Sequence, residues 1–198
     1  DVLKKTGAVE QRSLAHCIAA LDTFLTAVCA AMPVDLMPGD SDPCNYLLPQ
    51  QPLHACLLQH SSAQSTLNLC TNPHACTVGG VEFLGSSGQP LDDMIRYVPG
   101  EDRLGVLSQS LRMRHMAPTA PDTLGCYPFT SHDPFIMDSC PHVYFAANQP
   151  AFSSALVEGD DGQRVRVVSV PDFAREPTLV LVNLNTLECT PVTFGGLE

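Results

Sequence analysis

The chain has 198 residues, enough for one large domain or for one domain and part of another. Charged residues make up only 16% of it, against about 25% in typical globular proteins. Ten Lys and Arg stand against 21 Asp and Glu, and this net charge of −11 argues against independent high-affinity nucleic-acid binding. No apolar run approaches the roughly 20 residues that cross a bilayer, which argues against a membrane protein. A surface so poor in charge is expected to face another protein over part of its area.

A long amphipathic helix is predicted from about Glu10 to Ala31. Its apolar residues recur at spacings of three and four and predict one stripe facing the core: Leu14, Ile18, Leu21, Leu25 and Val28. Ser13 is a candidate cap for the first turn, and Met32-Pro33 ends the helix because proline has no amide donor. The chain begins at Asp1 and enters this helix almost at once, so we expect a piece of a longer protein.

The middle of the chain mixes strands and helices. From Val34 to Pro52 a short apolar strand precedes a proline-rich loop, a pattern typical of the carboxyl edge of a sheet, where ligands bind. Between Ser65 and Gly85 the pattern is β, and Gly79-Gly80 predicts a hairpin turn. Two helices are then expected, over Leu91 to Tyr97 and Glu101 to Met116.

The second half of the chain is predicted to be rich in strands, after a long loop from Ala117 to Pro134. The expected strands are Val143 to Ala147, Arg164 to Val170, Thr178 to Leu184 and Leu187 to Phe194. An alternation typical of a half-buried antiparallel sheet recurs in them, at Val165, Val167, Leu179 and Leu181. The predicted class is α/β, with a strand-rich second half.

Nine cysteines are present, and no two form the C-x-x-C pair that zinc ribbons and redox motifs need. The nearest approach to a metal cluster is Cys70, His74 and Cys76; scattered free thiols are the alternative. Free cysteines fit an intracellular, reducing compartment.

Two stretches resemble, in damaged form, the motifs of metal-dependent phosphoesterases. Such enzymes hold two cations about 4 Å apart with carboxylate, imidazole and amide ligands, so that a bridging water attacks phosphorus. Gly39-Asp40-Ser41-Asp42 aligns with G-N-H-D/E, but Asp40 replaces the Asn ligand and Ser41 the catalytic His. Pro141 to Tyr144 aligns with G-H-x-H, but Tyr144 replaces the last His and leaves His142 alone. A working two-metal site is therefore not expected.

Other candidate residues carry weaker signals. For the lone His motif of those enzymes, the candidates are His54, His60 and His74. Nucleophilic serine chemistry has no support, since the pairs Ser61-Ser62 and Ser86-Ser87 lack a G-x-S-x-G elbow. The loop Gly85 to Gly88 is too short for a phosphate loop. The basic cluster at Arg112, Arg114 and His115 is either a solvated helix end or a binding patch.

Five longer stretches resemble the B subunits of eukaryotic replicative DNA polymerases, and the delta branch of that family most of all. They are Val34 to His54, Thr71 to Gln89, Leu111 to Phe129, Asp133 to Pro150 and Val170 to Phe173. The string A-P-T-A-P-D-T-L-G-C-Y-P-F is too long and specific to be met by chance.

The resemblance implies a calcineurin-like metallophosphoesterase sandwich that has lost its activity. Residues 1–198 would be the C-terminal part of that domain, without the upstream oligonucleotide-binding-type domain and the first phosphoesterase motifs. It implies no cofactor, and the positions Asp40, Ser41, Asp42, His142 and Tyr144 would be the remains of the metal site.

The resemblance also implies an accessory role in DNA replication and repair synthesis, in the nucleus. The partners would be the cysteine-rich C-terminal domain of the polymerase delta catalytic subunit and the third subunit of that polymerase, with DNA reached only through the complex. The alternative is a metal-dependent phosphodiesterase or exonuclease of the calcineurin-like superfamily.

Overall fold

The computed structural model describes residues 2–98, 100 and 102–195, with side chains of the first helix from Leu14 onward. The chain forms two compact units. Unit 1 holds the chain up to Pro38, residues 42–44 and residues 51–71; unit 2 holds residues 39–41, residues 45–50 and the chain from Asn72 onward. No described helix combines the length and the hydropathy that a membrane span requires.

Unit 1 is built on one long helix and a short parallel strand pair. Its elements are α1 (Val2–Cys29), β1 (Val34–Leu36), the 3-10 helices η1 (Ala55–Leu57) and η2 (Ser61–Ala63), and β2 (Leu67–Leu69). β1 and β2 pair in parallel. The end of α1 is tied to the chain before β2, because Gln64 Nε2 donates to the Thr26 carbonyl (2.9 Å) and Thr66 Oγ1 to that of Cys29 (2.7 Å). The bond from Thr66 satisfies a carbonyl that the last helical turn leaves open.

The buried side of α1 is centred on a carboxylate. Asp22 is 4% exposed and accepts hydrogen bonds from the amide (2.8 Å) and hydroxyl (2.6 Å) of Ser61 and from the amide of His60 (2.9 Å). The His60 ring lies 2.8 Å from the same carboxylate. Burial alone would raise the pKa of Asp22, but these hydrogen bonds outweigh it and hold the pKa well below its usual range.

The predicted stripe of α1 is partly wrong. The helix begins at Val2 instead of Glu10, so Ser13 lies inside it and is not its cap. Leu25 is buried as predicted, but Leu14 is 51% and Leu21 37% exposed. The buried side of the helix includes Asp22. Hydropathy could not predict a buried carboxylate there, because the residues that hydrogen-bond to it are distant in sequence. The end of the helix near Met32-Pro33 is confirmed.

Unit 2 is built on a five-stranded mixed sheet in the order β3-β4-β5-β7-β6. The strands are β3 (His74–Val78), β4 (Val81–Ser86), β5 (Val143–Gln149), β6 (Ser153–Glu158) and β7 (Arg164–Pro171). β4, β5 and β7 run parallel, and the two outer pairs are antiparallel. The remaining elements are the helices α2 (Gln89–Ile95) and α3 (Arg103–Arg112) and the hairpin strands β8 (Thr178–Val182) and β9 (Cys189–Thr193).

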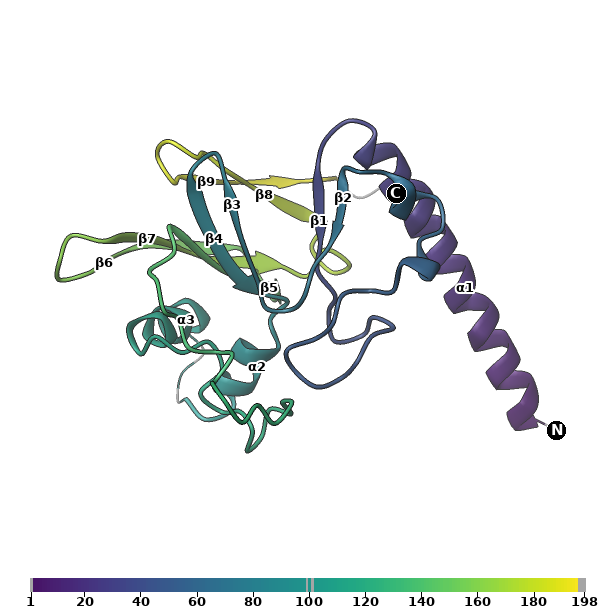
Figure 1. The fold of residues 1–198 in the computed structure, drawn as a ribbon, viewed down its shortest axis with the longest axis horizontal. Helices are drawn as coiled ribbons and strands as arrows, with labels where there is room; N and C mark the ends of the chain where they lie inside the picture. The colour runs from purple at the N-terminus through teal and green to yellow at the C-terminus, as the bar shows by residue number, and fades with distance from the viewer. Residues whose placement is uncertain (1, 99, 101, 196–198) are drawn as a thin grey trace. The chain divides into compact units, whose positions relative to one another are not determined.

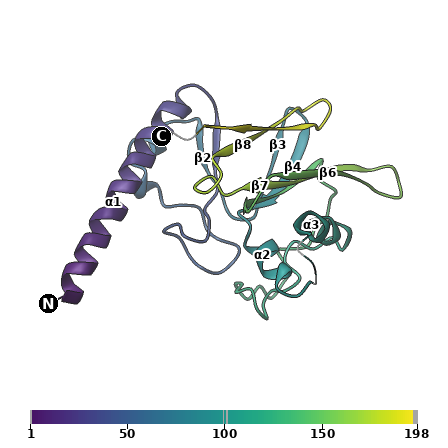
Figure 2. The ribbon, with the colours of Figure 1, turned by 180° about the vertical axis from the view of Figure 1, so that it is seen from behind.

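The sheet of unit 2 is covered on both faces. Figures 1 and 2 show α2 and α3 on one face and the β8–β9 hairpin on the other. On the helix face Tyr144 and Val167 are buried with Leu107 of α3. On the hairpin face Val168 packs with Val180 of β8. Strands covered on both sides explain why β7 has valines at consecutive positions where a one-sided strand would alternate.

The class predicted from sequence is confirmed: the chain is mixed α/β, and most strands lie in its second half. The Gly79-Gly80 hairpin and both predicted helices are also confirmed. The antiparallel expectation is wrong for the centre of the sheet, and β6 was missed because it opens on two serines and is only six residues long. Leu179 and Leu181 face outward, while Thr178 is buried, because the hairpin packs through its other side. The calcineurin-like sandwich stays a prediction.

The Asp22 carboxylate gives a testable link between pH and stability. Asp22→Asn keeps the shape but removes the charge, and should lower the free energy of unfolding at pH 7 by about 1–3 kcal/mol. Because the folded-state pKa is depressed, the charge stabilises the fold above the unfolded pKa of about 3.9, and this contribution is lost as the pH falls through the folded value. Denaturant unfolding of both proteins at pH 7 and at pH 3 measures it.

The control is Asp122→Asn, which alters an exposed carboxylate in a loop. A stability gap between the native chain and Asp22→Asn that stays constant from pH 7 to pH 3 would contradict the assignment.

Candidate functional site

Polar side chains converge where the parallel strands β4 and β5 end. In open α/β sheets ligands bind beyond the carboxyl ends of the strands, so this edge is where a site is expected. Ser86 ends β4 and Gln149 ends β5. The side chains gathered there form what we call the edge network: Gln50, Asn72, Ser87, Gln89, Asp92, Arg103, Asn148 and Gln149.

Asn72 is the centre of the edge network. It is 0% exposed, and its amide nitrogen Nδ2 lies 2.7 Å from Gln50 Oε1, 2.9 Å from Ser87 Oγ and 3.0 Å from Gln89 Oε1. Its carbonyl oxygen accepts the Ser87 amide at 3.0 Å. Gln89 Nε2 also donates to Gln50 Oε1 (3.0 Å), so three amide side chains satisfy one another.

Backbone geometry brings the two strand ends together. Gly88 has a φ of +112°, and a Cβ there would clash with the Ala147 carbonyl oxygen, so only glycine allows this approach. Asn148 has a φ of +55°, and its Nδ2 donates to the Ser87 carbonyl at 2.8 Å. A register shift between Ala146 and Gln149 gives the end of β5 its bend.

Arg103 extends the network to α2 and α3. It is the first residue of α3, and its Nη1 donates to Gln149 Oε1 at 2.7 Å and also to the carboxylate of Asp92 in α2. Gln149 is 0% exposed. The network therefore holds amides, a hydroxyl and one ion pair that bind each other. This composition differs from the carboxylate and imidazole set that a two-metal site requires.

The positions predicted as remains of a metal site lie elsewhere. Asp40, Ser41 and Asp42 are exposed on the loop after β1. Tyr144 is buried under α3, its hydroxyl 3.1 Å from Ser110 Oγ, and burial raises its pKa to about 12. His142 precedes β5, and its Nδ1 accepts the Glu82 amide at 3.0 Å.

The alignment of G-H-x-H with Pro141 to Tyr144 therefore falls at the amino end of β5. A ligand-bearing motif would lie at the carboxyl end of the strand, which Asn148 and Gln149 form. Sequence reasoning passed over these two residues and Asn72. A signal was available for Asn148 and Gln149, because they directly follow the strand predicted over Val143 to Ala147.

The other candidate residues have structural partners. His54 Nδ1 accepts the Cys56 amide at the start of η1, and His60 binds Asp22. The Ser61 hydroxyl donates a hydrogen bond to Asp22, and the Ser87 hydroxyl donates one to Gln89. None of these side chains is arranged as a nucleophile with an adjacent base.

The candidate zinc residues are divided between the two units: Cys70 is buried just after β2, and His74 and Cys76 belong to β3. The zinc hypothesis stays a prediction.

The basic cluster after α3 is mainly structural. Arg114 donates through Nε to the Met137 carbonyl (3.2 Å) and through Nη2 to the Asp138 carbonyl (3.0 Å). His115 Nε2 lies 2.9 Å from Asp133. Burial would raise the pKa of Asp133, but its hydrogen bonds with His115 and the Phe135 amide lower it overall. Arg112, in the last turn of α3, is exposed.

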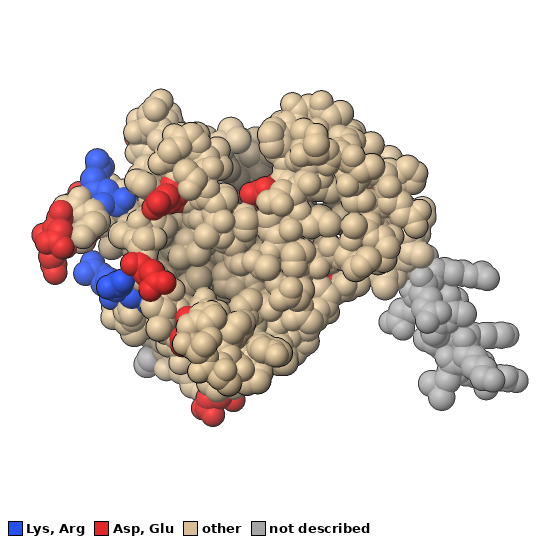
Figure 3. Space-filling view, in the orientation of Figure 1, with Lys and Arg blue, Asp and Glu red and all other residues tan. Residues whose placement is uncertain are grey.

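Charged side chains are few on the face drawn in Figure 3 and gather at the end that carries the β6–β7 hairpin. Most of this face is uncharged, in keeping with the low charged fraction of the sequence.

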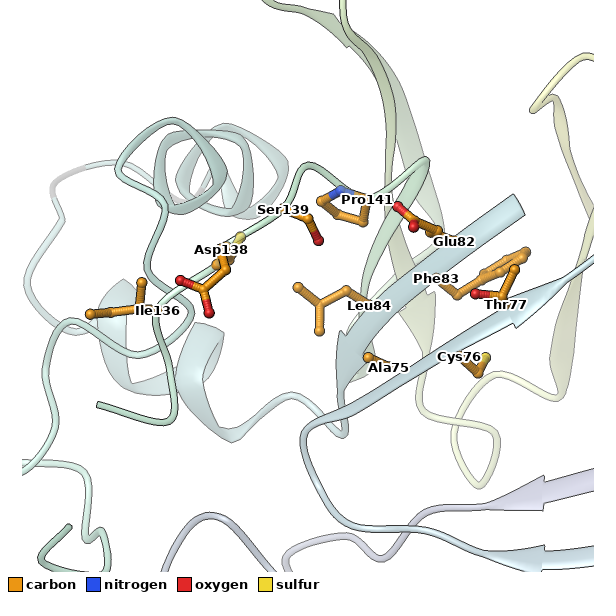
Figure 4. Close-up of a pocket in the computed structure, with 11 residues that line it drawn as sticks. Ala75, Cys76, Thr77, Glu82, Phe83, Leu84, Ile136, Asp138, Ser139 and Pro141 are labelled. Atoms are coloured by element: carbon orange, nitrogen blue, oxygen red, sulfur yellow. The ribbon is translucent and has the colours of Figure 1, made fainter. Parts of the chain in front are cut away.

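A pocket of about 340 Å³ lies between the β3–β4 hairpin and residues 136–141 (Figure 4). Its described lining has two carboxylates, Glu82 and Asp138, which lie on opposite sides with Leu84 between them in Figure 4. Carboxylates so separated do not form a ligand cluster.

Comparisons with known proteins agree on one family. Residues 3–154 match the model of the DNA polymerase alpha/epsilon B-subunit family. The DNA polymerase delta small subunit of Oryza sativa subsp. japonica is 45% identical over 94% of this chain and 43% of its own length. That of Arabidopsis thaliana is 46% identical over 94% of this chain and 42% of its own length. That of Saccharomyces cerevisiae is 35% identical over 93% of this chain and 44% of its own length.

The chain thus spans less than half of the length of these relatives. The family match covers most of the chain, including α1, the edge network and the sheet as far as β6. The chain belongs to the DNA polymerase alpha/epsilon B-subunit family.

Proposed function

We propose that this chain is the C-terminal part of the inactive phosphoesterase-like domain of a DNA polymerase delta small subunit. In that role it is a non-catalytic accessory element in the nucleus. It links the C-terminal domain of the catalytic subunit to the third subunit during replication and repair synthesis. The observation that carries the proposal is the similarity to DNA polymerase delta small subunits of plants and yeast over more than nine-tenths of the chain.

The edge network supports the loss of catalysis. In a calcineurin-like enzyme the carboxyl ends of the central strands carry the ligands of two cations, and a bridging water needs both ions. In this chain the same edge carries buried amides, Asn72 and Gln149, already paired with protein groups. Such a network stabilises the edge without offering the negative charge that divalent cations need.

The charge of the chain supports an indirect relation to DNA. With a net charge of −11, the chain would repel the phosphate backbone. An acidic accessory element placed beside basic DNA-binding subunits avoids competing with them for DNA.

Complex formation tests the proposed function. The full-length subunit that contains this chain should elute from a sizing column as a one-to-one complex with the C-terminal domain of the delta catalytic subunit, and as a ternary complex when the third subunit is added. A folded subunit that elutes apart from both partners at low salt would contradict the proposal. The same experiment with the alpha catalytic subunit's C-terminal domain is the matched specificity control.

Catalysis can be tested on the same protein. With Mn²⁺ or Mg²⁺ and bis-(p-nitrophenyl) phosphate, we expect no hydrolysis above the rate with metal alone, because the edge that would carry metal ligands holds amides such as Asn72 and Gln149 that are already paired with protein groups. Metal-dependent turnover that disappears in His142→Ala would favour the phosphodiesterase alternative.

The edge network predicts a stability effect at Asn72. Asn72→Ala leaves the buried Ser87 amide without its acceptor and removes the donor that Asn72 supplies to Gln50, so the free energy of unfolding should fall by about 2–4 kcal/mol. Asn185→Ala, which shortens an exposed asparagine, should change it by less than about 0.5 kcal/mol. Denaturant unfolding measures both, and equal effects of the two substitutions would show that the network is not structural.

A further inference from the structure

β6 is an edge strand with one unpaired side. It pairs with β7 through six consecutive residues, Ser153 to Glu158, and among the described residues no other strand lies beside it. An edge of this kind presents a row of free backbone donors and acceptors, which another extended chain can pair with.

β6 lacks the features that usually protect an edge. Its sequence is S-S-A-L-V-E, without proline or lysine, and its pairing with β7 has no bulge. The only charge, Glu158, stands at its end. Natural proteins commonly place lysine, proline or a bulge on edges that must remain single.

The helix layer on one face of the sheet reaches as far as β6. Its first five residues are each partly buried, whereas Val165, Val167 and Val168 of the neighbouring β7 are fully buried. Val157 packs against the core beneath α3. A strand added next to β6 would therefore find apolar surface beside it.

A groove of about 550 Å³ adjoins this edge between the end of α3, residues 137–140 and the β6–β7 hairpin. Its floor is apolar, formed by Leu111, Met137, Val157 and Val165. Its rim carries four carboxylates, Asp138, Glu158, Asp160 and Asp161, against two arginines, Arg112 and Arg114.

Some charged side chains of the groove have partners of their own, and others form no ion pair with a described cation. Arg114 is engaged with two backbone carbonyls, and Glu158 lies 3.9 Å from Arg164. Asp160 and Asp161 stand next to each other in the exposed turn, and no ion pair joins either of them to a described cation. This is the charged end visible in Figure 3. A partner with a positive charge would relieve their mutual repulsion.

We propose that an extended segment of a partner subunit pairs with the free edge of β6 as an additional strand. Its apolar side chains enter the groove, and a lysine or arginine meets Asp160 and Asp161. Backbone pairing would supply affinity, and the apolar floor with its acidic rim would select the sequence. The identity of the partner as a polymerase delta subunit rests on the proposed function.

The test measures backbone amide exchange of residues 153–158 in the full-length subunit, free and in the complex. Labelled overlapping 15-residue peptides from the catalytic subunit's C-terminal domain and from the third subunit are titrated in parallel. We expect slower exchange along β6 in the complex, and the same protection from a peptide with alternating apolar and basic residues. Asp160→Lys and Asp161→Lys should each weaken the binding of that peptide at least tenfold. Asp122→Lys, which makes the same change of charge in another loop, should leave the binding unchanged.

The outcomes separate the two proposals. A complex that assembles while β6 exchanges as in the free protein, with no peptide protecting it, overturns the inference and leaves the proposed function intact. Protection of β6 by a peptide, without assembly of the complex, supports the inference and overturns the proposed function. Protection that appears in the free protein with rising concentration identifies a second copy as the occupant and overturns the inference.

Discussion

The parallel pairing of β4, β5 and β7 is the constraint on which unit 2 depends. Parallel strands cannot be joined by tight turns, so the chain must travel from one end of the sheet to the other between them. The connection from β4 to β5 carries α2 and α3, which cover one face of the sheet, and the connection from β5 to β7 carries the edge strand β6. The β8–β9 hairpin covers the other face, and the carboxyl ends of the strands are left to polar residues.

If the proposed function holds, that polar edge explains how a phosphoesterase-like arrangement can lose its chemistry and keep its fold. A buried edge lined by ligand residues without cations would hold unpaired charges, which are costly. Amides such as Asn72 and Gln50 offer both donors and acceptors and can satisfy one another without an ion. The edge network would thus serve as a structural replacement for a metal centre, and binding surfaces would be free to develop elsewhere on the unit.

Sequence reasoning succeeded where local signals decide structure. The Gly79-Gly80 turn, the helices after it and the end of α1 follow from glycine, proline and periodicity. Sequence reasoning failed where residues distant in sequence determine whether a side chain is buried or how a strand pairs. Asp22 is buried because Ser61 and His60 approach it, and β5 is parallel to β4 because of a long crossover. The candidate site was sought in histidine motifs, and the amides at the strand ends were missed because single amides carry no recognisable pattern.

The crossover between β4 and β5 also governs how the protein folds. Phe83 and Val143 are partners in the sheet, yet the whole segment with α2, α3 and the proline-rich loop separates them in the chain. Contacts of such high sequence separation form late, because the entropy of closing the intervening loop is lost before the pairing is gained. During synthesis β4 can pair only with β3 until β5 has left the ribosome. The nascent chain therefore passes through a stage with exposed strand edges, in which chaperones or early assembly with a partner compete with aggregation.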